Sequence, residues 1–283
     1  MRERGNIVKA LKMYQVDVFT NEYYKGNPAA VCILEEEIDE KYMKSIASEM
    51  NLSETAFVIP IDKEKNIYSL RWFTPEVEVP LCGHGTIGTT KVLFDVLGIV
   101  ADEIIFETKN GRLIAKKYET GIGIDMPLDV PTDIELPEGL LRSLGLDEYE
   151  DIKIGKTTRK LIIRVNDENE ILNLRPDFNQ LKELKFKDDI KGVAVTTSNT
   201  DNYDFTSRYF NPWAGINEDP VTGSVHTVLA KYWGEILNRS EMKAYQASYR
   251  GGELVLKIKD ENRLELIGDA IIVLKGEIYV PTV

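Results

Sequence analysis

The stretch Leu81-Cys82-Gly83-His84-Gly85-Thr86-Ile87-Gly88-Thr89-Thr90-Lys91-Val92-Leu93-Phe94 joins a turn of small residues to a helix. Glycine is unfavourable inside helices and strands, so the first half is expected to be a turn. The second half places Ile87, Thr90 and Phe94 on one face of a helix. Such a turn leaves unpaired backbone N–H groups in front of the helix, where the helix dipole favours an anion. The stretch therefore predicts a place that holds a carboxylate or an enolate.

The same pattern returns in the second half of the chain. Arg71-Trp72-Phe73-Thr74-Pro75 is matched 137 positions later by Arg208-Tyr209-Phe210-Asn211-Pro212, and Gly85-Thr86 is matched 138 positions later by Gly223-Ser224. We therefore predict an α+β fold of two pseudo-symmetric lobes, each a mainly antiparallel rolled sheet around a central helix. Two such lobes that face each other would bring both glycine turns to a shared cleft, the usual place for a small-molecule site.

Pro127, Pro131 and Pro137 lie in a polar stretch of the chain. We interpret this stretch as the crossover between the lobes. The first strand-like run begins at Met13, so residues 1–12 are expected to be an N-terminal arm. The N-terminal lobe is then predicted over residues 13–126 and the C-terminal lobe over residues 127–283. The final strand is a candidate for packing on the N-terminal lobe.

The composition restricts the partners of the protein. The chain has 283 residues, of which 43% are hydrophobic, and can bury a large core. Its 35 basic and 47 acidic residues give a net charge of −12, which is unsuited to nucleic acid or an anionic membrane. No apolar run approaches the roughly 20 residues of a membrane span. We therefore expect a small-molecule substrate, and neither a nucleic-acid nor a membrane partner.

Residues that bind metals or form disulfides are few. Cys32 and Cys82 do not make a disulfide scaffold and are expected to be reduced thiols, as is typical of a cytoplasmic protein. His84 and His226 are the two histidines, and with this spacing no metal site is expected. The chain has neither a Walker A loop nor a dinucleotide GxGxxG after a strand, so we predict no cofactor.

His84 lies inside the first glycine turn and is a candidate catalytic residue. A helix N-terminus disfavours a protonated imidazole, so we expect His84 to be a neutral donor or acceptor. Cys82 raises the alternative of a Cys–His nucleophile, but residues two apart in extended chain point different ways and no third orienting group is evident. His226 falls within the second helix, where a buried packing role is expected.

The matching turn of the second half is Glu218-Asp219-Pro220-Val221-Thr222-Gly223-Ser224. Acidic residues before a helix can act purely as caps that compensate the helix dipole. Two acids together with Thr222 and Ser224 exceed what capping needs, so we predict Asp219 as an acid or as an anchor for a substrate ammonium group. We predict that substrate is bound by small residues of the two turns: Gly83, Gly85, Thr86, Gly223 and Ser224.

Glu54 lies between the first helix and a strand, in Asn51-Leu52-Ser53-Glu54-Thr55. At an offset of 137 its counterpart is Lys191, so the second half supplies no equivalent acid. A single carboxylate suits a one-base proton transfer better than a two-base racemisation.

Four stretches together resemble the phenazine-biosynthesis-like (PhzF) family, in the family's order from about Met13 to the C-terminus. They are Val18-Phe19-Thr20 followed by Gly26-Asn27-Pro28-Ala29-Ala30-Val31, then Asn51-Leu52-Ser53-Glu54-Thr55-Ala56-Phe57-Val58, Leu81-Cys82-Gly83-His84-Gly85-Thr86 and Glu218-Asp219-Pro220-Val221-Thr222-Gly223-Ser224. The resemblance implies the diaminopimelate epimerase fold, a homodimer, and a protein without metal or organic cofactor.

The resemblance also implies roles for individual residues. Glu54 is similar to the family's proton-shuttling carboxylate, and His84 and Asp219 resemble its polar partners across the cleft. Diaminopimelate epimerase uses two cysteines from opposite glycine turns. Here Cys82 stands opposite Pro220, so two-thiol epimerisation is not expected.

The leading hypothesis is a cofactor-independent isomerase that moves a proton within a small carboxylate-bearing substrate. The best-understood family member isomerises trans-2,3-dihydro-3-hydroxyanthranilate by moving one proton, and a single base such as Glu54 suits that type. One alternative is an amino-acid racemase or epimerase that uses Glu54 and a second group such as Asp219. Another is a metabolite-binding protein that kept the cleft and lost catalysis.

Overall fold

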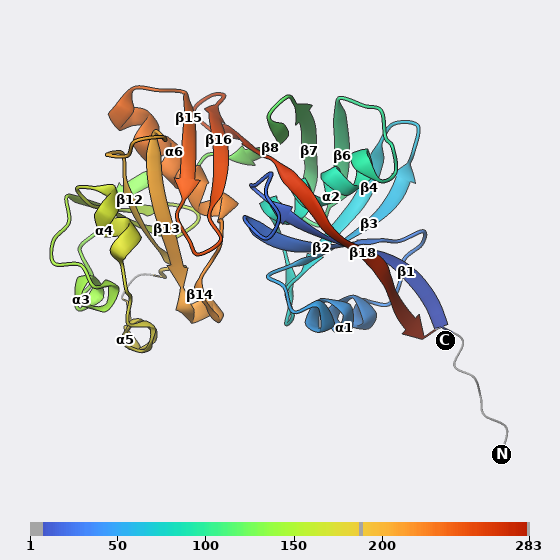
Figure 1. Ribbon diagram of the computed structural model, residues 1–283, viewed down its shortest axis with the longest axis horizontal. Coiled ribbons are helices and arrows are strands. Elements are labelled where there is room, and N and C mark those ends of the chain that lie inside the picture. Colours follow the sequence, from blue (N-terminus) through green and yellow to red (C-terminus); the bar gives the residue numbers. More distant parts are fainter. Residues whose placement is uncertain (1–7, 187–188, 282–283) are drawn as a thin grey trace, which may run out of the picture. The chain divides into compact units, whose positions relative to one another are not determined.

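The computed structural model describes residues 8–186 and 189–281, which divide into two compact units (Figure 1). Unit 1 comprises the described residues up to Ile124 and from Asp269 onward, and unit 2 runs from Asp125 to Gly268. The elements of unit 1 are β1 Val8–Val18, β2 Asn27–Ile33, α1 Glu40–Met50, β3 Thr55–Asp62, β4 Ile67–Phe73, β5 Glu78–Val79, α2 Gly83–Asp95, β6 Glu103–Thr108, β7 Gly111–Tyr118, β8 Gly121–Pro127 (which continues into unit 2) and β18 Ala270–Pro281.

The elements of unit 2 are β9 Pro131–Asp133, α3 Leu140–Leu144, β10 Asp151–Gly155, β11 Leu161–Arg164, α4 Glu168–Asn173, α5 Phe178–Glu183, β12 Val193–Thr197, β13 Phe205–Asn211, the 3₁₀ turn η1 Pro212–Ala214, β14 Ile216–Glu218, α6 Gly223–Leu237, β15 Glu241–Gln246, β16 Gly252–Ile258 and β17 Arg263–Gly268.

The sheets of the two units have the same topology. In unit 1 the strands are paired in the order β18-β1-β2-β3-β4-β6-β7-β8, with β5 also paired to β4. In unit 2 the order is β9-β10-β11-β12-β13-β15-β16-β17, with β14 also paired to β13. Each sheet is antiparallel except for two parallel pairs, β2–β3 and β4–β6 or β11–β12 and β13–β15. This agreement confirms the duplicated α+β unit predicted from the sequence.

Each sheet is rolled around one long helix. Ten of the 13 residues of α2 are buried, and so are ten of the 15 residues of α6. A helix buried on nearly all sides must be surrounded by other elements, and α2 contacts β1, β2, β3, β7 and β18. A Cβ at Gly88 would lie 3.4 Å from Val16 and Val18, an ordinary contact distance, so this face of α2 packs directly on β1.

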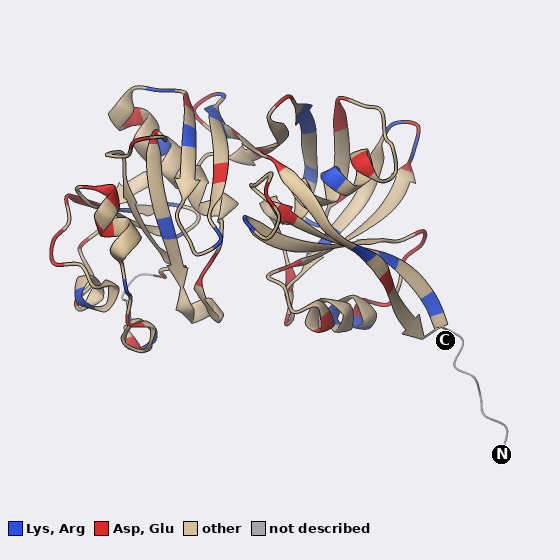
Figure 2. Cartoon of the chain, viewed as in Figure 1, with Lys and Arg blue, Asp and Glu red and all other residues tan. Residues whose placement is uncertain are grey.

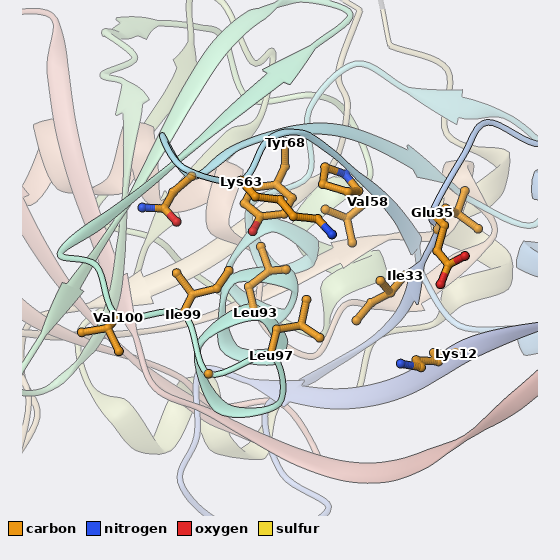
Figure 3. Close-up of a pocket in the computed structure, with 14 residues that line it drawn as sticks. Lys12, Ile33, Glu35, Val58, Lys63, Tyr68, Leu93, Leu97, Ile99 and Val100 are labelled. Atoms are coloured by element: carbon orange, nitrogen blue, oxygen red, sulfur yellow. The ribbon is translucent and has the colours of Figure 1, made fainter.

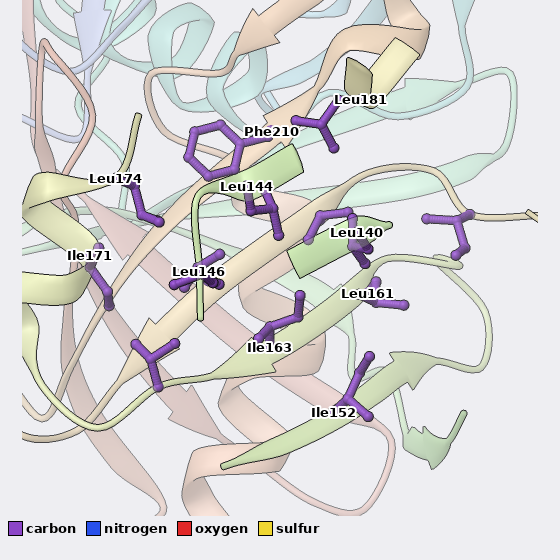
Figure 4. Packing of buried hydrophobic residues seen from close by; sticks show 14 of the residues in the cluster. Leu140, Leu144, Leu146, Ile152, Leu161, Ile163, Ile171, Leu174, Leu181 and Phe210 are labelled. Atoms are coloured by element: carbon purple, nitrogen blue, oxygen red, sulfur yellow. The ribbon is translucent and has the colours of Figure 1, made fainter. Parts of the chain in front are cut away.

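The outer face of each sheet is covered by shorter helices. In unit 1, α1 is capped by Asp39 and buries Met43, Ile46 and Ala47 against the sheet. Tyr42 and Met50 of the same helix are half-buried. In unit 2, α3, α4 and α5 pack on β10 to β13 through the cluster shown in Figure 4. These helices were not predicted, because five or six residues are too few to show helical periodicity.

The N-terminal strand is longer than predicted. It begins at Val8 and pairs with β18 as far as Val18, so residues 8–12 of the predicted arm are part of a strand. Residues 1–7 lie outside the described residues.

The charges are scattered over both units, with acidic and basic residues on strands, helices and loops alike (Figure 2). No helix among the described residues has the length and apolar character to cross a bilayer. Cys32 and Cys82 are both free and buried.

Candidate active site

The predicted residues of unit 1 meet at the N-terminus of α2. Glu54 directly precedes β3, and its carbonyl accepts a hydrogen bond from the Ala30 amide of β2. Cys82 is the N-cap of α2, where its Sγ accepts a bond from the Gly85 amide at 3.3 Å. His84 is the second residue of the helix and is buried. Strand pairing thus fixes the backbone at Glu54, and the helix start fixes the backbone at Cys82 and His84.

The imidazole of His84 lies between a carboxylate and a thiol. Its Nε2 is 3.2 Å from Oε2 of Glu54, and its Nδ1 is 3.7 Å from Sγ of Cys82. The side chains of His84 and Glu54 are 9% and 21% exposed, so the pair is largely shielded from water. Glu54 is therefore the orienting third group that was not evident from the sequence. This arrangement can move a proton between a carboxylate and an imidazole.

The expectation of a neutral His84 is wrong. Burial opposes protonation, but the charge of the Glu54 carboxylate and the contacts of the imidazole with Glu54 and Cys82 outweigh it, so the pKa of His84 is raised well above its ordinary value. The N-terminus of α2 was the only influence on the pKa of His84 that the sequence revealed. The carboxylate of Glu54 has the opposite effect and outweighs it. Burial raises the pKa of the Cys82 thiol, which disfavours the thiolate that a nucleophile needs.

A metal ion could be bound by these donors only after rearrangement. The ligand atoms of Glu54, Cys82 and His84 lie within 4.8 Å of one another. However, the imidazole presents a different nitrogen to each neighbour, and one ion can bind only one of the two. The observed geometry fits a chain of proton donors and acceptors better than a three-ligand metal site.

The other predicted residues of this turn differ in accessibility. Gly83 is half-buried and Gly85 is buried. Thr86 is fully buried, and its hydroxyl donates to the Cys82 carbonyl at 2.7 Å. The Thr86 hydroxyl therefore stabilises the turn, and the binding of substrate by Thr86 stays a prediction.

Gly85 is needed for packing. A Cβ there would lie 2.9 Å from both Sγ of Cys82 and Cδ1 of Trp72, whereas one at Gly88 would meet only ordinary contacts of 3.4 Å or more. We expect Gly85→Ala to destabilise the protein by about 1–3 kcal/mol through overpacking. The matched Gly88→Ala should be neutral or stabilising by up to about 1 kcal/mol, because alanine favours the helix. Urea unfolding of both variants measures this, and equal effects would contradict the packing account.

In unit 2 the predicted turn is held by a hydrogen-bond network. The Thr222 hydroxyl donates to Oδ2 of Asp219, and the Asp219 amide donates to the Tyr209 carbonyl at 3.1 Å. Gln246 accepts from the Thr222 amide at 2.9 Å and donates to the Asp219 carbonyl at 2.7 Å. The carboxylate of Asp219 is thereby fixed just before α6.

Glu218, the other acid of this turn, has a structural role. It forms a two-point ion pair with Arg208, at 2.7 and 2.9 Å. Unit 1 repeats the pair with Arg71 and Glu78, at 2.8 and 3.0 Å. The two glutamates are 140 positions apart and the two arginines 137. The three-residue turn η1 lies in the extra length of unit 2.

The helix starts and the strand register correct two of the counterparts inferred from the repeat. Both central helices begin with glycine, at Gly83 and Gly223, so Cys82 corresponds to Thr222 and not to Pro220. In the strands, Thr55 pairs with Phe73 as Val193 pairs with Phe210, so Glu54 corresponds to Gly192 and not to Lys191. Neither corrected counterpart in unit 2 is a cysteine or an acid.

Lys160 and Tyr209 border the same turn and were missed from the sequence. The Lys160 ammonium donates to the Ser224 hydroxyl and lies 4.7 Å from the centre of the Tyr209 ring. Lys160 precedes an apolar run at the start of β11, and nothing in that run indicates a functional lysine.

His226 is buried within α6, as expected. Its Nδ1 lies 2.8 Å from the Thr222 carbonyl, and burial is the main cause that lowers its pKa to about 4. The two histidines of the chain therefore have pKa values shifted in opposite directions.

We expect histidine NMR spectra at pH 7 to show a doubly protonated His84 and a neutral His226. Because the pKa of His226 is depressed, the unfolded chain takes up its proton first as the pH falls. From about pH 6.5 to pH 4 this linkage should remove ~3 kcal/mol of stability. His84 acts in the opposite sense: its contribution is present below the unfolded pKa and is lost as the pH rises through the raised folded value. A neutral His84 at pH 7 would contradict the assigned ion pair.

A cavity of about 650 Å³ in unit 1 lies at the other end of α2 (Figure 3). Leu93, Leu97, Val58 and Tyr68 are among its lining residues. It contains none of the predicted site residues, which gather at the N-terminus of α2.

Comparison with known proteins agrees with the resemblance noted in the sequence. The family model for phenazine biosynthesis-like protein (PhzC-PhzF) matches residues 16–276. An uncharacterized isomerase of Halalkalibacterium halodurans is 43% identical over 271 residues, which cover 95% of this chain and 98% of that protein.

Solved structures give the same result for the fold. The crystal structure of a PhzF-family phenazine biosynthesis protein from Enterococcus faecalis is 40% identical, with a TM-score of 0.89, and the match covers 96% of this chain and all of that chain. A hydroxyproline epimerase from Agrobacterium vitis shares the fold alone, at 10% identity and a TM-score of 0.60 over 100% of this chain and 95% of that chain. The predicted fold class is confirmed, and the chain belongs to the family of phenazine biosynthesis-like (PhzC-PhzF) proteins.

Proposed function

We propose that the protein is a cofactor-independent isomerase that moves one proton within a small carboxylate-bearing substrate. The observation that carries the proposal is the shielded Glu54–His84 pair, with Nε2 and Oε2 3.2 Å apart. The family is named for a biosynthetic activity, and the related protein of H. halodurans is described as an isomerase.

In the proposed mechanism Glu54 takes a proton from a carbon next to an electron-withdrawing group and returns it elsewhere on the same molecule. His84, protonated at neutral pH because of its raised pKa, donates toward negative charge that develops on the substrate. Gly83 lies at the start of α2, where free backbone N–H groups can contribute to the same stabilisation.

Unit 2 is proposed to supply the groups that hold the substrate. The N-terminus of α6, at Gly223 and Ser224, would bind the carboxylate, and Asp219 would bind a polar group of the substrate as the predicted partner of Glu54. A two-base racemase is the second candidate, with Asp219 as the second base. The corrected counterpart of Glu54 is Gly192, so the repeat does not provide that base.

Optical and proton-exchange assays distinguish these candidates. Purified protein is incubated with trans-2,3-dihydro-3-hydroxyanthranilate and with a panel of L-amino acids, before and after treatment with EDTA. We expect a double-bond shift in a cyclic carboxylate without racemisation, unchanged by EDTA. Racemisation of an amino acid would support the two-base candidate, and saturable binding without exchange would support a binding protein.

The predicted homodimer and cytoplasmic location remain part of the proposal. Two buried free thiols suit a reducing compartment. Light scattering coupled to gel filtration would reveal a monomer if the dimer is wrong.

A further inference from the structure

The final strand of unit 1, β18, lies at an edge of its sheet. In the part of the chain that the structure describes, β18 pairs with β1 and with no further strand, so the backbone groups along its other edge face outward. Because β2 pairs with β1 only from Lys12 onward, residues 8–11 of β1 and the end of β18 form a two-stranded ribbon beyond the sheet (Figure 1). Long open edges and two-stranded ribbons are places where another chain can add a strand.

A glycine stands in the middle of this edge strand without a reason inside unit 1. The φ of Gly276 is not in the left-handed region, and a Cβ there would meet only Cδ2 of Leu274, at 3.9 Å. The irregularity in the pairing of β18 with β1 lies elsewhere, between Gln15 and Val16. Glycine weakens a strand, and inside one it often marks a bulge or the close approach of another backbone. Since the described residues show no bulge and no crowding at Gly276, the approach of another chain is the better explanation.

The residues on either side of Gly276 are complementary to each other. The sequence Leu274-Lys275-Gly276-Glu277-Ile278 has opposite charges next to the glycine and apolar residues outside them. Lys275 and Glu277 are exposed, and Leu274 is 48% exposed. If two copies of β18 run antiparallel with the two glycines opposite each other, Lys275 of each copy faces Glu277 of the other. In the same register Leu274 of each copy faces Ile278 of the other.

Neighbouring registers lack this match. A shift of one copy by two residues places either Lys275 or Glu277 opposite its own equivalent in the other copy. Like charges directly opposite each other on neighbouring strands are destabilising, whereas opposite charges contribute favourably. The charges therefore favour the register in which Gly276 lies on a two-fold axis, and two-fold symmetry is the commonest symmetry of homo-oligomers.

We propose that β18 joins two copies of this chain by antiparallel strand pairing, with Gly276 on the two-fold axis. The sheet of unit 1 then continues into that of the second copy, and the open edge of each β18 is covered. The inference rests on the homodimer of the proposed function and names the surface that forms it. None of the predicted site residues lies on β18, so the dimer and the proton transfer can be tested separately.

Exchange of the two charges tests the interface. Lys275→Glu and Glu277→Lys each place like charges opposite each other at two equivalent positions, so each should raise the Kd of the dimer about 10-fold or more. The double variant Lys275→Glu/Glu277→Lys restores both opposite-charge pairs and should recover most of the wild-type affinity. Sedimentation velocity of the full chain over a range of protein concentrations gives the Kd of each variant.

Stability is the control for the charge variants. Glu277 lies opposite Lys12 of β1 in its own chain, so Glu277→Lys also creates a like-charge pair within the monomer. Lys275 lies opposite Tyr14, so Lys275→Glu has no such effect. Urea unfolding of each variant measures this contribution apart from association.

A cysteine at the axis tests the register. Gly276→Cys places two thiols on directly opposed residues, within the distance that a disulfide can span. Because the native Cys32 and Cys82 are buried, the introduced thiol is the one that reacts. Mild oxidation should give a covalent dimer of Gly276→Cys. The control Glu49→Cys, which places an exposed thiol on α1, should give none.

The inference is overturned if the dimer survives both single exchanges unchanged or if the double variant does not restore it. Equal crosslinking of Gly276→Cys and Glu49→Cys would also overturn it. A wild-type protein that is monomeric at every concentration overturns both the inference and the predicted homodimer. The isomerase has a separate test, because a dimeric wild type without proton exchange contradicts the reaction and leaves the interface standing.

Discussion

Replacing Glu54 by glutamine is expected to lower the rate of proton exchange by about 10²–10⁴-fold, the usual contribution of a positioned general base. The amide has nearly the same shape but cannot accept the proton. It also removes a negative charge that helps keep His84 protonated, so the pKa of His84 should fall in the variant. Exchange of substrate protons with D2O and histidine NMR measure the two effects separately.

A matched control for this variant is Glu49→Gln. Glu49 is an exposed glutamate of α1 in the same unit, and its substitution should leave both the exchange rate and the pKa of His84 unchanged. If Glu54→Gln retains the wild-type rate, Glu54 is not the base.

The largest effect on stability is expected for Arg208→Met, at about 3–5 kcal/mol, as for other buried ion pairs that lose one partner. Arg208 is 9% exposed, pairs with Glu218, and donates to the carbonyls of Ile171 and Leu174 at 3.0 Å each. Methionine would fill much of the space and leave the carboxylate without a cation among the described residues. Urea unfolding followed by tryptophan fluorescence gives the change in free energy.

The duplication provides the control. Arg71 pairs with Glu78 in the same way, but its side chain is 30% exposed and Glu78 also lies 3.4 Å from Lys109. Because Glu78 keeps a cation, Arg71→Met should cost only about 1–2 kcal/mol. An equal or larger loss for Arg71→Met would contradict the assignment of Arg208 as the more critical of the two.

The fold could be predicted largely from repeated sequence. The two glycine turns and the matching stretches Arg71–Pro75 and Arg208–Pro212 identified the duplication, and the helix expected after each turn is present as α2 and α6. The helices α3 to α5 could not be predicted, because they are short and are held by tertiary packing against the sheet.

The candidate site was predicted in part. Glu54 and His84 were both identified as candidates from the sequence. They lie 30 positions apart in the chain, and in the structure their side chains are in contact. Their charge state could not be predicted, because it depends on a contact between separate elements. The counterparts of Glu54 and Cys82 were misassigned because the offset between the repeats is not constant. The contacts of Lys160 have no local signal in the sequence, because they are made with the neighbouring α6 and β13.

The most direct test of the central claim, a one-base proton shift by Glu54, is ¹H NMR in D2O with trans-2,3-dihydro-3-hydroxyanthranilate and the amino-acid panel. The account predicts loss of a single C–H signal together with a shifted double bond, in the wild type and not in Glu54→Gln. Inversion at an amino-acid α-carbon, or undiminished exchange in Glu54→Gln, would contradict it.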